Sequence, residues 1–384
     1  MDSTLKHLTD RIQAAAADHT PLRIRGGGTK DFYGQLLQGE VLDISPLAGI
    51  ISYEPTELVV TVRSGTPLAE LETVLAQRGQ CLAFEPPHYT FSTTTAAATC
   101  GGMVAAGLSG PARASVGGLR DYVLGMSLLN GRGELLTFGG QVMKNVAGYD
   151  VSRLMAGALG TLGVLTEISL KVLPVAPAEA TLVFELDQAR ALAQLHQWGA
   201  QPLPLNASCW VRDGGAAGSP ELLFVRLRGA VAAVESACDR MTRDVPGRRL
   251  DNTVATQDWQ ASRHLTLPFF SAPSPNTPSS ALGLWRLSVP QTTPALDLPW
   301  PQLVEWHGGQ RWLRAPLSAH TALREATAAV GGTATLFVAP QDGSAGSAPR
   351  FEPLKEPLSG IHRRLKAEFD PAGIFNQGRL YPDF

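Results

Sequence analysis

Apolar positions at the start of the chain predict a helix and a strand, followed by a second strand and helix. The apolar residues of segment 5–15 recur at helical spacing, and residues 21–25 form a strand-like run that ends in three consecutive glycines. The β-branched run at 58–62 predicts the next strand. A helix follows, which we expect Thr66 to cap and Gly79 to close.

The sequence pattern in the middle of the chain is typical of strands. A strand at 81–84 would complete a strand–helix–strand unit. Segments 123–129 and 134–138 flank the turn at 130–133, whose Asn-Gly start predicts a β-hairpin. Another strand falls within 161–173, before a stretch rich in proline and alanine.

Beyond that stretch the pattern changes, and we place a domain boundary near residue 176. Strands alternate with helices, which predicts a small separate α+β sheet built from 182–186, 189–198, 207–211, 222–227 and 231–241. Residues 251–349 are weakly periodic, and only 284–289 and 336–338 are strand-like. An apolar stripe over 358–369 predicts a last helix that ends at Asp370-Pro371.

Charge and cysteine usage exclude several classes of function. The formal net charge is -2 and no block of like charge stands out, so we expect neither nucleic acid nor an anionic membrane surface as a partner. The four cysteines lack metal-binding spacing, which favours buried reduced thiols without an iron–sulfur cluster or zinc. No signal peptide or run of ~18 apolar residues is present, so we expect no membrane span and a cytoplasmic protein.

Glycine clusters are the main chemical signal. In Arg25–Lys30, consecutive glycines let successive backbone N–H groups converge on an anion, although a plain turn would have the same sequence. The small residues of 99–111 would let a flat ligand lie against backbone, or would form a tightly packed helix with a glycine cap. Further clusters occur at 117–123, 144–150 and 157–164.

The order of these clusters, together with Asn376–Arg379, closely resembles the PCMH-type FAD-binding family, named for p-cresol methylhydroxylase. The resemblance covers 20–175 and 355–384. Segments 99–111 and 144–150, Arg120-Asp121 and the short C-terminal tail are most similar to the E subunits of bacterial glycolate oxidases. The resemblance implies an α+β fold with a two-part FAD-binding domain, a smaller α+β cap domain, and a C-terminal helix and tail that return to the flavin. The corresponding ranges are 1–175, 176–354 and 355–384.

The resemblance also assigns cofactor-binding residues by position. It implies that the diphosphate is wrapped by the backbone of Arg25, Gly26, Gly27, Gly28, Thr29 and Lys30. Along the flavin and ribityl chain it places Thr99, Gly101, Gly102, Ser109 and Gly110, and near the ribose and diphosphate Gly118 and Asp121. It places the backbone of Gly163 and Val164 beside the adenine. It also implies that Pro87 shapes the strand-to-loop corner before the flavin-binding stretch. Asn376 and Arg379 would reach the isoalloxazine, where a cation would stabilise the reduced flavin; a surface charge is the alternative for Arg379.

The same resemblance implies noncovalent FAD. Relatives that tether the cofactor often use a histidine in the first glycine loop, where this chain has Thr29-Lys30-Asp31. Cys100, within the flavin stretch, is the alternative point of attachment.

A catalytic centre is not evident. Relatives that oxidise 2-hydroxy acids directly have an H-x-H metal cluster, whereas the eight histidines here are far apart in sequence. His307 and His264 are the candidates for a base assembled from distant residues; packing or surface roles are the alternative.

We therefore expect a flavin subunit of a multi-subunit glycolate or 2-hydroxy-acid oxidase or dehydrogenase. Its partners would be a second FAD subunit carrying the hydroxy-acid site, with D-lactate in the same substrate class, and an iron–sulfur subunit. Contact with the inner membrane would be peripheral and made through this complex. The alternatives are a self-sufficient FAD-dependent alcohol or hydroxy-acid oxidase, and a nucleotide-binding scaffold without redox function. If exposed, Trp285, Trp306 and Trp312 would mark a docking face; core packing is the other interpretation.

Overall fold

A computed structural model describes residues 3–36, 38–89, 97–140, 151–212, 219–271, 281–343 and 348–382. The chain divides into two compact units. The first comprises Met1–Ser109, Gly118–Val175 and Pro349–Phe384, and the second comprises Gly110–Gly117 and Ala176–Ala348. The whole 144–150 motif lies within 141–150, outside the described residues.

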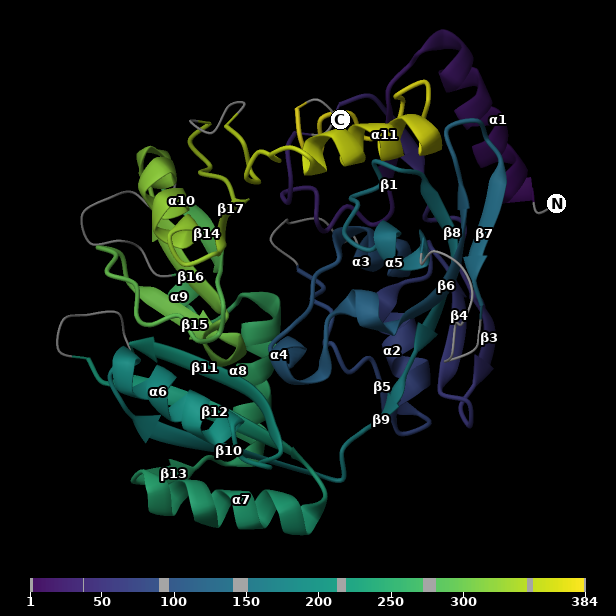
Figure 1. The fold of residues 1–384 in the computed structure, drawn as a ribbon. Coiled ribbons are helices and arrows are strands. Elements are labelled where there is room, and N and C mark those ends of the chain that lie inside the picture. The colour runs from purple at the N-terminus through teal and green to yellow at the C-terminus, as the bar shows by residue number, and fades with distance from the viewer. Residues whose placement is uncertain are drawn as a thin grey trace. The chain divides into compact units, whose positions relative to one another are not determined.

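The first unit is built on an antiparallel sheet of five strands in the order β3-β4-β8-β6-β7. The predicted hairpin is confirmed, because β6 pairs with β7 and Leu129 lies opposite Leu135; Figure 1 shows these teal strands beside β8. The strands are β3 (Ile50–Glu54), β4 (Val59–Arg63), β6 (Val123–Leu129), β7 (Leu135–Gly139) and β8 (Val164–Lys171).

Helices α2 (Leu68–Ala76) and α3 (Cys100–Ala106) share one apolar core with this sheet. Helix α2 follows the predicted spacing, since its leucines at 68, 71 and 75 are fully buried. The predicted Thr66 cap is wrong: Pro67 holds the N-cap position, and the Thr66 hydroxyl accepts from Gly49 N (3.0 Å). The Thr66 hydroxyl therefore stabilises the loop at Gly49 and does not cap the helix.

The predicted strand at 81–84 is mostly a turn. Only β5 (Gln80–Cys81) pairs, with β9 (Leu173–Pro174), and the chain then turns so that Leu82 and Phe84 both enter the core. A turn is favoured because Glu85 N donates to the Leu82 carbonyl (3.0 Å).

A second core of this unit joins the N-terminus to the C-terminal tail. It contains the apolar face of α1 (Ser3–Asp18), β1 (Leu22–Arg25), β2 (Glu40–Asp43) and two tail residues, Ile374 and Phe375. Strand β1 pairs in parallel with β2, and Phe375 forms a parallel bridge to Leu22 on β1. The tail therefore extends the small sheet that carries the glycine loop.

Helix α11 (Leu358–Phe369), yellow in Figure 1, is the predicted last helix, and a buried ion pair fixes its end. Lys366 Nζ donates to Asp370 Oδ2 (2.7 Å) and to the carbonyls of Thr161 (2.7 Å) and Phe375 (2.8 Å). Asp370 in turn accepts from the N–H groups of Ile374 and Phe375. The remaining short helices of the unit are η1 (Leu119–Tyr122) and α5 (Val151–Met155).

The second unit contains one antiparallel sheet of eight strands in the order β13-β10-β12-β11-β15-β16-β14-β17. The predicted separate sheet is present but is not small, because β11 pairs with β15 and thereby joins the early strands to those beyond residue 280. The strands are β10 (Ala178–Glu185), β11 (Leu205–Arg212), β12 (Glu221–Gly229), β13 (Gly247–Arg249), β14 (Gly283–Ser288), β15 (Gln302–Glu305), β16 (Gln310–Ala315) and β17 (Thr333–Val338).

Helices of the second unit pack on this sheet through two apolar clusters, one around α6 and α7 and one around α10. Trp285 and Trp312 are 1% and 2% exposed, so they pack in the core and the docking-face interpretation is wrong for both. The helices are α4 (Arg113–Val116), α6 (Gln188–Gly199), α7 (Val231–Asp244), α8 (Asn252–His264), α9 (Pro268–Ser271), η3 (Trp306–Gly308), η4 (Leu317–Ala319) and α10 (His320–Ala328). Among the described residues, no helix is long and apolar enough to span a membrane.

Candidate functional site

An open cavity in the first unit gathers most of the predicted diphosphate and tail residues. Its empty volume is about 530 Å³, a value that includes the open space at its mouth. It is lined by Ile24, Arg25, Gly26, Gly27, Gly28, Thr29, Lys30, Asp31, Thr99, Gly102, Ala105, Ala106, Leu159, Asn376 and Arg379.

The glycine loop leaves β1 and forms one wall of the cavity. Within the described ranges, no group accepts a hydrogen bond from the backbone N–H of Gly26, Gly27, Gly28 or Thr29. Gly28 has a φ of +72°, a left-handed conformation that glycine adopts at low cost. Successive N–H groups in such a turn form a concave anion site.

Close packing explains the middle glycine of this loop. A Cβ built on Gly27 would lie 1.6 Å from the Ala97 carbonyl oxygen, and one on Gly26 would lie 2.4 Å from Thr99 Oγ1. Both glycines therefore let the loop approach the segment that leads into α3. The steric reason for Gly27 is contact with protein backbone, a constraint that sequence alone did not reveal.

Helix α3 presents small side chains to the cavity. Thr99 is its N-cap and accepts from Gly102 N (3.2 Å), while Gly102, Ala105 and Ala106 line the cavity. Gly101 points the other way, because a Cβ there would lie 2.6 Å from Ser64 Cβ. The glycine-rich stretch thus forms a capped helix and also gives a ligand access to its backbone.

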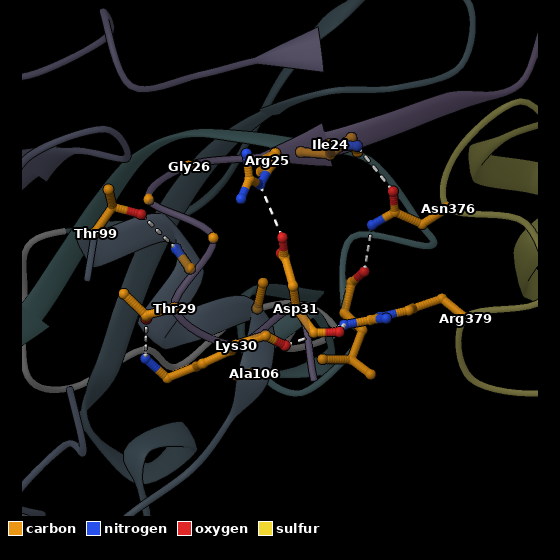
Figure 2. A pocket seen from close by; sticks show the side chains of 15 residues that line it. Ile24, Arg25, Gly26, Thr29, Lys30, Asp31, Thr99, Ala106, Asn376 and Arg379 are labelled. Atoms are coloured by element: carbon orange, nitrogen blue, oxygen red, sulfur yellow. Dashed lines mark hydrogen bonds and ion pairs between the residues drawn. The ribbon is translucent and has the colours of Figure 1, made fainter. Parts of the chain in front are cut away.

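Asn376 ties three segments of the wall together. Its Oδ1 accepts from Ile24 N (2.8 Å), its Nδ2 donates to the Leu159 carbonyl (2.6 Å), and its own N–H donates to the Leu22 carbonyl (2.9 Å). Figure 2 shows the side chain between β1 and the tail. Its φ of +42° is one that asparagine tolerates better than most residues.

Arg379 is 4% exposed, so the surface-charge interpretation is wrong. Its guanidinium donates to the carbonyls of Gln35, Lys30 (3.1 Å) and Asp31 (3.2 Å). Burial lowers its pKa to about 10, which leaves it charged at neutral pH. The contacts recorded for Arg379 hold the loop in place, and its predicted role beside the isoalloxazine stays a prediction.

The other charged groups of the cavity lie on the glycine loop. Arg25 Nε donates to Asp31 Oδ2 (2.9 Å), and Figure 2 shows the two side chains pointing toward one another. Lys30 Nζ lies 3.4 Å from Thr29 Oγ1 and 5.8 Å from the centre of the Tyr89 ring. Three cations and one carboxylate therefore line the cavity.

Other predicted binding residues in the first unit are not among the residues that line it. The Ser109 hydroxyl accepts from Leu119 N (3.0 Å), and Asp121 Oδ2 accepts from Gly118 N (2.9 Å), so both stabilise local turns. The remaining positions pack inside the unit or against its backbone: Pro87 is buried, Val164 is a core residue of β8, and a Cβ on Gly163 would lie 2.8 Å from the Leu129 carbonyl.

Gly110 belongs to the second unit, where its carbonyl accepts from Trp306 Nε1 (3.0 Å). His307 follows Trp306 in the chain. Its Nδ1 lies 3.0 Å from the Ser208 hydroxyl, and its Nε2 lies 3.0 Å from the Ser115 hydroxyl. Burial lowers the pKa of His307 to about 4. His264 ends α8. Neither histidine lines the cavity, and no group of three or more potential metal ligands occurs in the described part of the chain.

Five lining residues were not predicted: Ile24, Asp31, Ala105, Ala106 and Leu159. Helical spacing offered a signal for the alanines, because positions three and four beyond Gly102 share its face of α3. The alternation of β1 puts Ile24 on the other face from Arg25, which also lines the cavity, so it gave no signal for Ile24. Leu159 lies in the glycine cluster 157–164, which marked the segment but not this side chain.

These features fit a dinucleotide with a diphosphate at the glycine loop. Backbone N–H groups that have no acceptor among the described residues, together with nearby cations, suit phosphate oxygens, and the small residues of α3 admit a flat group against backbone. Cys100 is buried, and burial raises its thiol pKa far above the ordinary value, so a thiolate is strongly disfavoured there.

Comparisons with known proteins agree with this geometry. A family model described as an FAD binding domain matches residues 3–139. The chain is 43% identical to the glycolate oxidase subunit GlcE of Escherichia coli (strain K12) over 98% of this chain and 97% of that protein. It is 30% identical to the glycolate oxidase subunit GlcD of Bacillus subtilis (strain 168), over 48% of this chain and 38% of that protein.

A solved structure, 4-ethylphenol oxidase from Gulosibacter chungangensis, shares the fold with a TM-score of 0.68 and 15% identity, over 99% of this chain and 88% of that one. The α+β PCMH-type fold is thus confirmed. FAD is the cofactor, and the chain belongs to the GlcE family of glycolate oxidase subunits, a family of FAD-binding oxidoreductases.

Proposed function

We propose that this chain is the FAD-binding subunit of a multi-subunit oxidase or dehydrogenase of glycolate and related 2-hydroxy acids. The observation that carries the proposal is the 43% identity to GlcE over nearly the whole of both proteins. The cavity supports it, because its glycine loop, α3 and the tail form one site within the first unit.

The parts of the chain would share the work as follows. Residues 1–175 bind FAD, 176–354 form a cap domain, and 355–384 complete the flavin site through Asn376 and Arg379. The contacts of both tail residues with the glycine loop or β1 support the last assignment. When bound, FAD supplies the redox chemistry, and the residues of this chain bind and orient it.

The diphosphate would lie against Arg25–Lys30, with Thr99, Gly102, Asn376 and Arg379 around it. Roles for Pro87, Gly101, Ser109, Gly110, Gly118, Asp121, Gly163 and Val164 remain part of the proposal. Attachment would be noncovalent, which the burial of the Cys100 thiol supports.

The proposed partners are a second FAD subunit that carries the hydroxy-acid site and an iron–sulfur subunit that takes the electrons onward. Similarity to both GlcE and GlcD supports a complex with two related flavoproteins. The iron–sulfur subunit rests on the family resemblance. We further propose that the complex is cytoplasmic and meets the inner membrane only peripherally, which cell fractionation would test.

Reconstitution tests the proposal against a self-sufficient oxidase. The purified chain should bind FAD yet leave its flavin oxidised when glycolate or D-lactate is added without oxygen. Glycolate-dependent dye reduction should require co-expression with the neighbouring flavin and iron–sulfur subunits. Rapid bleaching of the flavin in the isolated chain would instead establish the self-sufficient oxidase.

A further inference from the structure

Asp31 is the one acidic side chain among the residues that line the described cavity. An acidic group is unfavourable where a diphosphate is to bind, because like charges repel at short range. The position of Asp31 therefore needs an explanation beyond the binding of FAD.

The partner of Asp31 is the first residue of the glycine loop. Arg25 Nε donates to Asp31 Oδ2 at 2.9 Å, and the two side chains are 37% and 39% exposed. Asp31 N also donates to the Gly28 carbonyl (3.1 Å), so a tight turn brings the carboxylate back toward Arg25.

The guanidinium of Arg25 packs into the loop that it begins. A Cβ built on Gly28 would lie 2.3 Å from Arg25 Nη2 and 2.7 Å from its Cζ. The guanidinium thus lies directly against Gly28, whose N–H has no acceptor within the described residues. The ion pair is placed across the loop that would receive phosphate, and Figure 2 shows it there.

We propose that Asp31 is an internal competitor of the FAD diphosphate: its carboxylate pairs with Arg25 in the flavin-free protein, and phosphate must displace it. This inference rests on the proposed function. Guanidinium groups bind carboxylate and phosphate with the same fork of donors, so one Arg25 cannot serve both fully. A carboxylate that stayed in place would also repel the phosphates.

Exchange at this position needs only a side-chain rotation. The Asp31 carbonyl accepts from Arg379 (3.2 Å), and the same guanidinium donates to the carbonyls of Lys30 and Gln35. The backbone is therefore anchored while the carboxylate is partly exposed. Asp31 would therefore lower the affinity for FAD without disturbing the shape of the cradle.

The test is to titrate the flavin-free full chain with FAD and to monitor binding by the quenching of flavin fluorescence. Asp31→Asn should lower the dissociation constant of FAD about 1.5- to 5-fold at low salt, as expected for one partly exposed charge pair. The gain should shrink at high salt. Inorganic diphosphate, as a competing probe, should have a lower inhibition constant for the variant than for the unmodified chain.

Glu40→Gln is the matched control. Glu40 pairs with Arg11 at 3.1 Å in the same unit and does not line the cavity, so its loss should leave the dissociation constant unchanged. Asp31→Ser provides a second variant, and far-ultraviolet circular dichroism verifies folding.

Unchanged or weaker FAD binding in folded Asp31→Asn and Asp31→Ser would overturn the competition and make Asp31 a positioning residue for Arg25. Failure of the unmodified chain to bind FAD at all would overturn the proposed function, and the competition with it. The two failures are distinguished by the unmodified chain alone.

Discussion

Replacing Asn376 tests whether the C-terminal tail holds the flavin site together. Asn376→Ala removes the acceptor of the Ile24 N–H and the donor to the Leu159 carbonyl, both in segments that line the cavity. It also places alanine at a φ of +42°. We expect a less stable first unit and weaker retention of FAD.

The size of the effect follows from these two changes. A buried group left without its partner costs ~1–3 kcal/mol, and the left-handed backbone adds ~1 kcal/mol for alanine. Asn376 is buried, and so is its bond to the Leu159 carbonyl, so the lower end of the range for each lost bond is a minimum. The free energy of unfolding should fall by at least about 3 kcal/mol in total.

Equilibrium urea unfolding of the flavin-free protein measures the loss, and FAD titration measures retention. Asn376→Gly restores backbone freedom without the side-chain bonds, so it should be about 1 kcal/mol less harmful than Asn376→Ala. Asn376→Asp keeps an acceptor for Ile24 N but turns a carboxylate oxygen toward the Leu159 carbonyl. Stability of Asn376→Ala within about 0.5 kcal/mol of the unmodified protein, with unchanged FAD affinity, would refute this reasoning.

Three further predictions concern attachment, the loop and pH. Purified protein should be yellow, and acid should release about one FAD per chain into the supernatant, because Cys100 is buried and its thiol protonated; colour in the pellet would contradict this. Gly27→Ala should sharply reduce FAD content, because its Cβ would collide with the Ala97 carbonyl. Gly199→Ala is the control, since the space around Gly199 is open and its FAD content should not change. Equal flavin content in the two variants would count against the glycine loop as the diphosphate site. Burial lowers the pKa of His307 from 6.5 to about 4, so the unfolded chain binds the proton first and the contribution of His307 to stability is lost as pH falls through that range. The loss in the free energy of unfolding is at most about 3 kcal/mol. Urea unfolding at several pH values should show that the stability of His307→Asn depends less on pH than that of the unmodified chain. The same pH dependence in both proteins would exclude His307 as the cause.

Local patterns predicted elements whose cause is local. The buried leucines of α2 and the hairpin of β6 and β7 follow from spacing and turn chemistry, and both predictions are confirmed. The glycine cap of α3, one of two interpretations of its segment, is also present. Helix α8 was missed, because its buried face is formed by Ala255, Trp259 and Ser262 and so carries no apolar stripe. Its N-cap, Asp251, was the available signal.

Long-range pairing could not be predicted in the same way. Strand β11 meets β15 about ninety residues later, and only the complete sheet shows why the strands beyond residue 280 belong with the earlier ones. The sequence also could not show which of several possible hydrogen-bond partners a polar side chain contacts. Thr66 serves a preceding loop, and Arg379 serves the carbonyls of the 30–35 segment. Sequence marked such residues as important without giving their partners.

The most direct test of the account is glycolate-dependent dye reduction by the purified complex, prepared with and without this chain. The account predicts that the chain alone binds FAD and is inactive toward glycolate, that the assembled complex is active, and that omitting this chain reduces the activity. It also predicts that Gly27→Ala, assembled in the complex, lowers the flavin content and the rate together. Full activity of the other subunits in the absence of this chain would contradict the account.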